Sequence, residues 1–223
     1  MADLSAAFTA ETGYELDIVA GSTGKLYFQI ARGAAIDAFL AADVDRPDRL
    51  IEDGLAAPES QFTYAIGRLV LWDPSGDDVG PDRLNAPNRG WLAIANPDLA
   101  PYGRAAYETL ATLGGDTSAE RDIVKGESVG QTLAFAATGG ARLAFVAQSQ
   151  IETLPEPLRG SYWRVPAEMH APIRQDAVLV TRGADNLAAL AFMDFLASDV
   201  ARDIIEELGY DTEDACQTSA RCG

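Results

Sequence analysis

The chain has 223 residues, 48% of them hydrophobic, which is enough for one domain or two small lobes with a sizeable core. Its net charge of -17 argues against nucleic-acid binding, because proteins that bind phosphates electrostatically use lysine and arginine. One histidine and two cysteines are too few for a zinc cluster or a Cys–His nucleophile pair, so no free metal cation, cofactor or catalytic centre is expected.

The two ends of the chain carry few structural signals. Residues 1–8 have neither the basic region nor the apolar run of a signal peptide, and no apolar run approaches the ~18 residues of a membrane helix. Residues 211–223 form a polar tail that contains Cys216 and Cys222. A disulfide between them requires an oxidising compartment, and the sequence leaves that pairing open.

Helical and strand patterns alternate in the first third of the chain. Leu4, Ala7 and Phe8 share one helical face, and Gly13 is placed to end that helix. The next predicted segments are a strand at 15–19, a helix at 24–32, a buried apolar run at 38–41, a short helix between Asp45 and Gly54, and a strand at 68–72.

The alternation continues after a loop at 73–90 that is rich in Pro, Gly and Asp. The predicted segments are strands at 92–95, 123–125, 143–146 and 177–180, and helices at 101–113, 129–138, 186–196 and 199–208. This order predicts an α/β fold with mostly parallel sheets and helices on both faces. Binding sites in such folds lie in loops at the carboxyl ends of strands.

Three strand-to-helix junctions, at 20–25, 96–103 and 125–131, place small or hydroxyl residues where a helix begins. Unpaired N–H groups and the helix dipole make such positions suitable for anions. The ordinary alternative is that Ser22, Thr23 and Ser128 only cap helices and that Pro101 is a first-turn proline. Composition does not decide between these interpretations, nor whether the junctions face one another.

The segment Gly21-Ser-Thr-Gly-Lys25 does not have the spacing of a phosphate-binding loop. That motif needs a glycine at the position of Val19 and a hydroxyl residue at the position of Leu26. The 34 acidic residues are typical of a solvated surface, and no pair is spaced as an acid/base couple.

Several blocks, in the right order between residues 2 and 210, resemble the molybdate-binding receptors of molybdate importers. The blocks are Gly21-Ser-Thr-Gly-Lys-Leu-Tyr27, Asp37-Ala-Phe-Leu-Ala-Ala-Asp43, residues 62–72, Ala95-Asn-Pro97 with Ala100-Pro-Tyr-Gly103, Ser128-Val-Gly-Gln131, Leu143-Ala-Phe-Val146 and Pro172-Ile-Arg-Gln-Asp-Ala177.

The resemblance implies a class II periplasmic binding protein with two α/β lobes and a cleft between them. Lobe I is expected at 1–65 and 175–210, and lobe II at 66–174. The expected function is not enzymatic: a periplasmic, monomeric receptor captures molybdate or tungstate and delivers it to the membrane permease of an ABC importer. The sequence does not separate molybdate from tungstate.

The resemblance also implies the binding residues. Ser22 and Thr23 match the oxyanion loop of the first lobe, and Tyr102 and Val129 match second-lobe positions that bind through their backbone N–H groups. The metal therefore enters as a tetrahedral oxyanion held by neutral donors. Where some members have a tyrosine after the strand at 143–146, this chain has Ala147.

Relative to that family, the chain aligns without a signal peptide and without the first strand with its oxyanion-binding loop. Leu4 and Phe8 are then expected to lose part of their cover, and oxyanion binding to be weakened. Two alternatives stay open at this point. One is a hydrolase or transferase that acts on a phosphate or acyl group in the cleft, and the other is a decayed receptor that no longer binds.

Overall fold

The computed structural model describes residues 1–21, 23–85, 90–114 and 122–213. Unit 1 comprises Met1–Ile66, Arg174–Glu207 and the described residues from Asp211, and unit 2 comprises Gly67–Ile173 and Leu208–Tyr210. The lobe boundaries expected from the sequence differ from these units at 66, 174 and 208–210, and the residues from Asp211, expected as a tail, are counted with unit 1. The expected boundaries stay a prediction. Within the described ranges, no helix is long and apolar enough to cross a membrane.

Unit 1 contains a four-stranded sheet with the order β1-β8-β2-β9. Its elements, in chain order, are α1 (Ala2–Thr12), α2 (Thr23–Ala31), β1 (Ala38–Leu40), α3 (Asp45–Glu52), β2 (Phe62–Gly67), β8 (Ile173–Leu179), α7 (Leu187–Leu196), α8 (Asp199–Glu207) and β9 (Tyr210–Asp211). Strand β1 pairs antiparallel with β8, with Phe39 opposite Val178.

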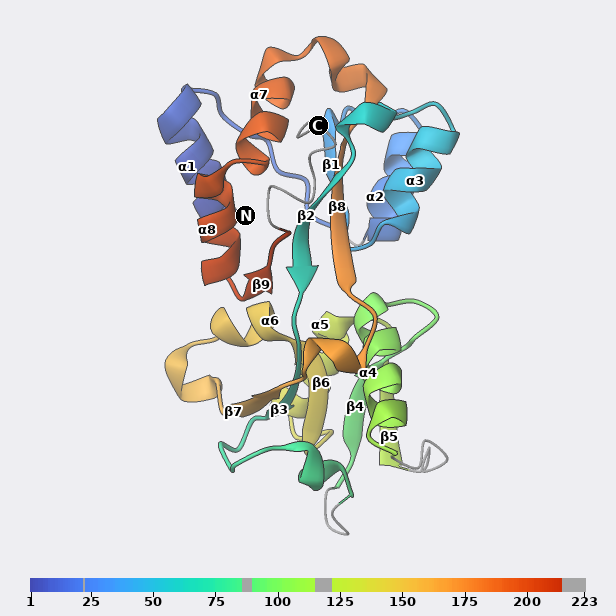
Figure 1. Ribbon diagram of the computed structural model, residues 1–223, viewed down its shortest axis with the longest axis vertical. Helices are drawn as coiled ribbons and strands as arrows, with labels where there is room; N and C mark the ends of the chain where they lie inside the picture. The colour runs from blue at the N-terminus through green and yellow to red at the C-terminus, as the bar shows by residue number, and fades with distance from the viewer. Residues whose placement is uncertain (22, 86–89, 115–121, 214–223) are drawn as a thin grey trace. The chain divides into compact units, whose positions relative to one another are not determined.

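Two groups of helices form the rest of unit 1 (Figure 1). Helices α2 and α3 bury Leu26, Ile30 and Leu50 in one cluster with Phe39 of β1 and Val178 of β8. Helix α1 contacts α7 and α8.

The contact of α1 with α7 is aromatic. The ring of Phe8 lies 5.4 Å from that of Phe192 and 5.6 Å from that of Phe195. Leu4 and Phe8 are 2% and 0% exposed, so the expected loss of cover over α1 was wrong. Phe192 and Phe195 of α7 cover Phe8.

The strand predicted at 15–19 is absent from the structure. Helix α1 ends at Gly13 as predicted, with φ of 76°, but residues 14–20 have no regular structure. Ile18 and Val19 are 44% and 54% exposed. An alternating pattern becomes a strand only where a neighbouring strand satisfies its backbone groups, and the pattern alone does not reveal that neighbour.

Unit 2 contains a five-stranded sheet with the order β5-β4-β6-β3-β7. Its elements are β3 (Leu69–Asp73), β4 (Leu92–Ala95), α4 (Pro101–Thr112), β5 (Ile123–Gly126), α5 (Val129–Ala137), β6 (Leu143–Ala147), α6 (Gln148–Glu152) and β7 (Ser161–Arg164). Short 3-10 turns complete the chain at Pro58–Ser60, Pro81–Asn85, Glu156–Leu158, Ala167–Met169 and Thr181–Asp185.

The α/β class predicted from the sequence is confirmed, but the unit 2 sheet is mixed where mostly parallel pairing was expected. Strand β4 is parallel to β5 and β6, whereas β3 is antiparallel to β6 and β7. The difference follows from the connections. Helices α4, between β4 and β5, and α5, between β5 and β6, provide the crossovers that parallel pairing needs.

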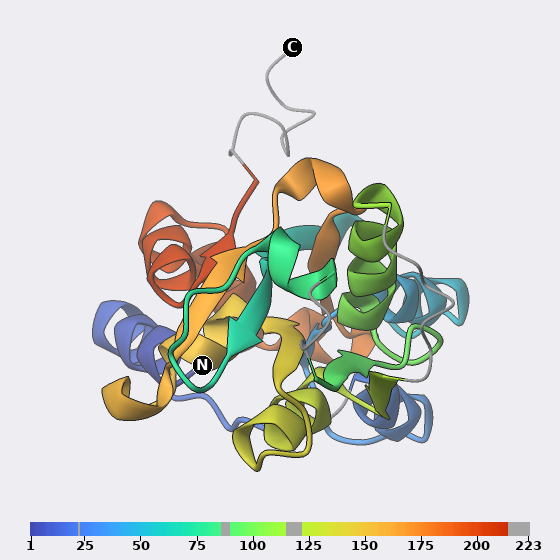
Figure 2. The same ribbon diagram turned by 90° about the horizontal axis from the view of Figure 1, so that it is seen from below.

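Alternate residues of the central strands of unit 2 face opposite helices. On β6, Leu143 and Phe145 belong to the cluster that includes α4, and Ala144 and Val146 belong to the cluster that includes α5. Successive side chains of a strand point to opposite faces, so a strand buried on both sides reads as a continuous apolar run. Figures 1 and 2 show α4 and α5 on the two sides of this sheet.

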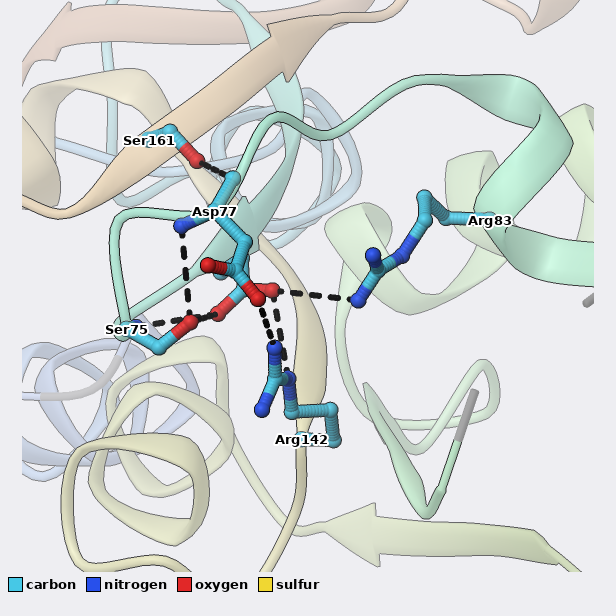
Figure 3. Close-up of polar contacts among 6 residues, drawn as sticks. Ser75, Asp77, Arg83, Arg142 and Ser161 are labelled. Carbon is cyan, nitrogen blue, oxygen red and sulfur yellow. Dashed lines mark hydrogen bonds and ion pairs between the residues drawn. The ribbon is translucent and has the colours of Figure 1, made fainter. Parts of the chain in front are cut away.

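A buried carboxylate fastens the loop after β3 to the start of β6 (Figure 3). Asp73 is 0% exposed, and its Oδ1 accepts hydrogen bonds from Ser75 N at 2.9 Å and Ser75 Oγ at 2.6 Å. Its Oδ2 accepts from Arg142 Nε at 3.2 Å and lies 3.6 Å from Arg83 Nη2. Arg142 also bonds Asp77 at 2.6 Å, and Ser161 Oγ donates to the Asp77 carbonyl.

An open pocket beside this cluster is lined by Asp73, Trp91 and Arg142 among others. The two charged side chains of the pocket are already paired with each other. We therefore assign the cluster a structural role, which is to anchor the loop at 73–90.

Replacing Asp73 with Asn should destabilise unit 2. The change removes the charge that two guanidinium groups share, and it places an amide donor against one of them. Hydrogen bonds to charged groups contribute about 1.5–3 kcal/mol each, so a loss of about 2 kcal/mol in unfolding free energy is expected. Urea unfolding followed by tryptophan fluorescence measures it, because Trp72, Trp91 and Trp163 all lie in unit 2.

The matched control is Asp77→Asn. Asp77 also pairs with Arg142, but its side chain is 61% exposed, and exposed pairs contribute about 0–1 kcal/mol. Equal destabilisation by both variants would contradict the anchoring role of Asp73.

Candidate functional site

The carboxyl ends of β4 and β5 meet at one edge of the unit 2 sheet. The two strands are in parallel register, with Ala95 opposite Gly126. The backbone N–H of Asn96, just after β4, donates to the carbonyl of Gly126 at 2.7 Å. Helices α4 and α5 both begin a few residues beyond this bond, so the junctions predicted at 96–103 and 125–131 lie side by side.

The first main-chain donor of α4 belongs to Tyr102. The N-cap Ala100 makes no side-chain capping bond, and Pro101 has no N–H. Gly103 N donates to Ala100 O at 2.9 Å. As at every helix N-terminus, the helix itself supplies no carbonyl acceptor for the N–H of its first turn, here that of Tyr102.

The side chain of Tyr102 is 6% exposed and belongs to the unit 2 core. Its hydroxyl packs against Gly67, where a Cβ would lie 2.2 Å from Oη. A Cβ on Gly103 would lie 2.1 Å from the carbonyl oxygen of Ala95, so the start of α4 rests directly on the end of β4. These contacts fix the Tyr102 backbone and keep its ring in the core, which leaves the main chain as the part suited to a ligand.

The start of α5 is capped by Ser128, whose Oγ accepts from Gln131 N at 3.2 Å. The ordinary interpretation of Ser128 as an N-cap is thereby confirmed. Val129 and Gly130 are the first two residues of α5, and a helix supplies no acceptor for the N–H groups of its first turn. The Gln131 side chain turns back to accept from Glu127 N at 2.6 Å, which fixes the approach to the helix.

Thr23 is the first residue of α2, in unit 1. Its Oγ1 accepts from Ala42 N, just beyond β1, at 3.1 Å. A hydroxyl that accepts one hydrogen bond still has its own hydrogen to donate. Ser22, the neighbouring predicted site residue, lies outside the described residues.

A buried carboxylate follows Ala42 in the sequence. Asp43 is 8% exposed, and it accepts from both the backbone N–H and the Nη1 of Arg46, each at 3.0 Å. Burial raises the pKa of Asp43, and the hydrogen bond from the Arg46 backbone opposes that shift. The group is therefore engaged at the start of α3, and its charge faces an arginine.

The structure thus brings two of the predicted site residues together, Tyr102 and Val129 in unit 2, and places Thr23 in unit 1. A third junction lies at the same sheet edge, where β6 ends and α6 begins. Sequence reasoning noted Ala147 at this junction but missed Gln150. There the Oε1 of Gln150 accepts from Ala147 N at 3.2 Å. A glutamine three residues after the preceding position is half of a capping-box pattern, and that signal was present in the sequence.

Comparison with known proteins identifies relatives over almost the whole chain. The molybdate-binding protein ModA of Rhodobacter capsulatus is 44% identical over 214 residues, 95% of this chain and 83% of that protein. ModA of Azotobacter vinelandii is 42% identical over 214 residues, 94% of this chain and 84% of that protein.

Solved structures share the fold. The periplasmic molybdate-binding protein of A. vinelandii superposes with a TM-score of 0.83 at 38% identity, covering 96% of this chain and 94% of that one. The sulfate-binding protein SubI of Mycobacterium tuberculosis H37Rv superposes at 0.77 with 13% identity, covering 97% and 84%, and shows the fold alone. The family model for bacterial extracellular solute-binding proteins matches residues 1–211, and the chain belongs to that family.

Proposed function

We propose that this chain is the solute-binding component of a molybdate or tungstate ABC importer. The observation that carries the proposal is the pair of helix starts at one sheet edge, where Asn96 N bonds Gly126 O and the amides of Tyr102 and Val129 begin α4 and α5. Relatives at 44% and 42% identity are named as molybdate-binding proteins, which supports the choice of ligand.

The chemistry of these donors suits a tetrahedral dianion. Its oxygen atoms only accept hydrogen bonds, and first-turn amides only donate them. The dipoles of α4 and α5 add positive potential at their N-termini. Because the chain carries a net charge of -17, its long-range field repels anions, and capture depends on these local donors.

In this proposal, Ser22 and Thr23 add hydroxyl donors from the first lobe, and the oxyanion lies in the cleft between the lobes. The Thr23 hydroxyl, oriented by Ala42 N, is suited to that role. The protein is then a monomeric periplasmic receptor that passes its ligand unchanged to a membrane permease and catalyses no reaction.

Molybdate and tungstate should bind more tightly than sulfate. A ring of donors spaced for a larger oxyanion leaves some of them unpaired around a smaller one, at about 1–3 kcal/mol each. One or two such losses correspond to roughly tenfold to several-thousandfold discrimination. Titration calorimetry at one ionic strength measures all three affinities, and equal affinity for sulfate and molybdate would refute selection by size.

Lys25→Ala should lower molybdate affinity only modestly, by less than about tenfold, because neutral donors rather than an ion pair hold the ligand. Lys25 is exposed and lies near Thr23 in α2. The control is Lys125→Ala, which removes the other lysine of the chain. A loss of a thousandfold with Lys25→Ala alone would show that an ion pair carries the site.

Val129→Pro tests the α5 amide without removing the helix. Proline is well tolerated at the first helical position, and Ser128 before it is extended, with φ of -149° and ψ of 162°, as a residue before proline should be. Loss of one hydrogen bond to a charged ligand should weaken molybdate binding by about tenfold to a hundredfold.

The control for that variant is Val129→Ala, which shortens the side chain but keeps the N–H. Calorimetry should show it within about threefold of the unmodified chain, since no donor is lost. Similar affinities for the proline and alanine variants would mean that the Val129 amide does not bind the ligand.

A further inference from the structure

The peptide unit between Ala41 and Ala42 lies just beyond β1 and contacts the hydroxyl of Thr23. Its N–H, that of Ala42, donates to Thr23 Oγ1 at 3.1 Å, and this contact lies at the surface of unit 1. Because the Ala42 N–H occupies one side of the oxygen, the hydroxyl hydrogen of Thr23 points elsewhere and is available to donate. The position of Ala42 therefore decides in which direction Thr23 donates.

The sheet of unit 1 holds this peptide unit on its upstream side. Ala41 N donates to the carbonyl of Asp176 at 2.8 Å, which continues the antiparallel pairing of β1 with β8 by one residue past Leu40. The Ala41 carbonyl accepts from Tyr64 Oη of β2 at 3.4 Å, and the Ala41 side chain is fully buried. Movement of Ala41 would therefore disturb its pairing with β8.

Asp43 holds the chain on the downstream side of the same peptide unit. Its Oδ1 accepts from Arg46 N and its Oδ2 from Arg46 Nη1, each at 3.0 Å, so one side chain closes the turn from 43 to 46. That turn leads into α3, whose Leu50 belongs to the same core cluster as Leu26 of α2. Asp43 thus ties the residue after Ala42 to the packed helices of unit 1.

Asp43 is also the more buried partner of its ion pair. The exposed fraction of its side chain is 11%, against 35% for Arg46. Removing a carboxylate from water costs free energy, so a buried ion pair is weak evidence that the pair adds stability. Its two hydrogen bonds do define one conformation of the 43–46 turn, and the placement of the neighbouring Ala42 N–H depends on that conformation.

We propose that Asp43 is a positioning residue for oxyanion binding: by closing the 43–46 turn it keeps the Ala42 N–H on Thr23 Oγ1, and so directs the Thr23 hydroxyl toward the ligand. This inference rests on the proposed function, in which Thr23 is a donor, and adds to it a residue that does not touch the ligand. The negative charge of Asp43 faces Arg46, which keeps it from opposing a bound dianion at full strength.

A purely structural role for Asp43 predicts a different pattern of effects. If Asp43 only caps α3, its replacement lowers the stability of unit 1, and any change in affinity is the same whether or not position 23 carries a hydroxyl. If Asp43 acts through Thr23, its replacement has no effect on affinity once that hydroxyl is gone. A double-mutant cycle between Asp43 and Thr23 separates the two roles.

The test is titration calorimetry of the full chain with sodium molybdate. Thr23→Val removes the hydroxyl and keeps the branched side chain, and it should weaken binding by about tenfold to a hundredfold, as for one lost hydrogen bond to a charged ligand. Asp43→Ala should weaken binding by about fivefold or more, but by no more than Thr23→Val, because its effect passes through that residue. The double variant should bind within about twofold of Thr23→Val alone.

Asp43→Asn is the milder variant, and it remains informative if Asp43→Ala does not fold. Its side-chain oxygen still accepts from Arg46 N, but an amide replaces the oxygen that faces the Arg46 guanidinium. It should weaken binding by at least about twofold and by less than Asp43→Ala. In the Thr23→Val background it should have no effect on affinity.

The matched control is Asp53→Ala. Asp53 lies just after the other end of α3, where its carboxylate accepts from Tyr27 Oη of α2 at 2.9 Å. This variant removes a carboxylate contact between the same two helices and leaves the 43–46 turn and the Ala42 bond in place. It should change molybdate affinity by less than about twofold, and thermal melting compares its loss of stability with that of Asp43→Ala.

The possible results separate this inference from the proposed function. If the unmodified chain binds neither molybdate nor tungstate, both fail. If it binds, and either Thr23→Val or both Asp43 variants bind as tightly as the unmodified chain, the role of Asp43 fails and the amides of unit 2 still support the proposed function. The role also fails if the effects of Asp43→Ala and Thr23→Val add in the double variant, or if Asp53→Ala weakens binding as much as Asp43→Ala.

Discussion

The hydrogen bond from Asn96 N to Gly126 O, at 2.7 Å, is the interaction on which the candidate site of unit 2 depends. It extends the pairing of β4 with β5 by one residue beyond the end of β4. From that point the two chains diverge, one into α4 and the other into α5. Without this shared register, two helix N-termini would be separate capping sites rather than one group of donors at one edge.

Close packing holds those helix starts in place. Helix α4 rests on the end of β4 so tightly that only glycine fits at position 103, and the buried ring of Tyr102 ties the same turn to Gly67. At α5, the Ser128 cap and the Gln131 side chain fix the first turn from both sides. Donors held rigidly by the fold lose little conformational freedom when a ligand arrives, which is the usual basis of preorganised binding. The Asp73 cluster serves the fold of the same unit and contributes no ligand donor in this account.

Much of this organisation could be predicted from the sequence where the signal is local. The helix end at Gly13, the Ser128 cap and the buried strand at 92–95 follow from residue types at fixed positions. The strand predicted at 15–19 was wrong because pairing depends on a partner far away in the sequence. For the same reason, the sequence did not predict the antiparallel pairing of β3. It also did not predict β7, because the strand has only four residues, too few to show an alternating pattern of polar and apolar side chains.

The candidate site shows the same limit. Sequence reasoning identified the junctions that contain Tyr102 and Val129, but it could not decide that they lie together, because that depends on the register between β4 and β5. It missed the contact between Gln150 and Ala147 at the start of α6, although half of the capping-box pattern was present in the sequence. Ser22 lies outside the described residues, and its role stays a prediction.

The central claim is that main-chain donors at the starts of α4 and α5 bind the oxyanion. Crystals of the full chain grown with tungstate test it most directly, because anomalous scattering locates the tungsten atom independently of any fitted side chain. The account predicts one strong peak beside the amides of Tyr102 and Val129, with oxyanion oxygens within hydrogen-bonding distance of both. A fully occupied peak elsewhere, for example beside Arg142, with none at these two helix starts, would contradict it.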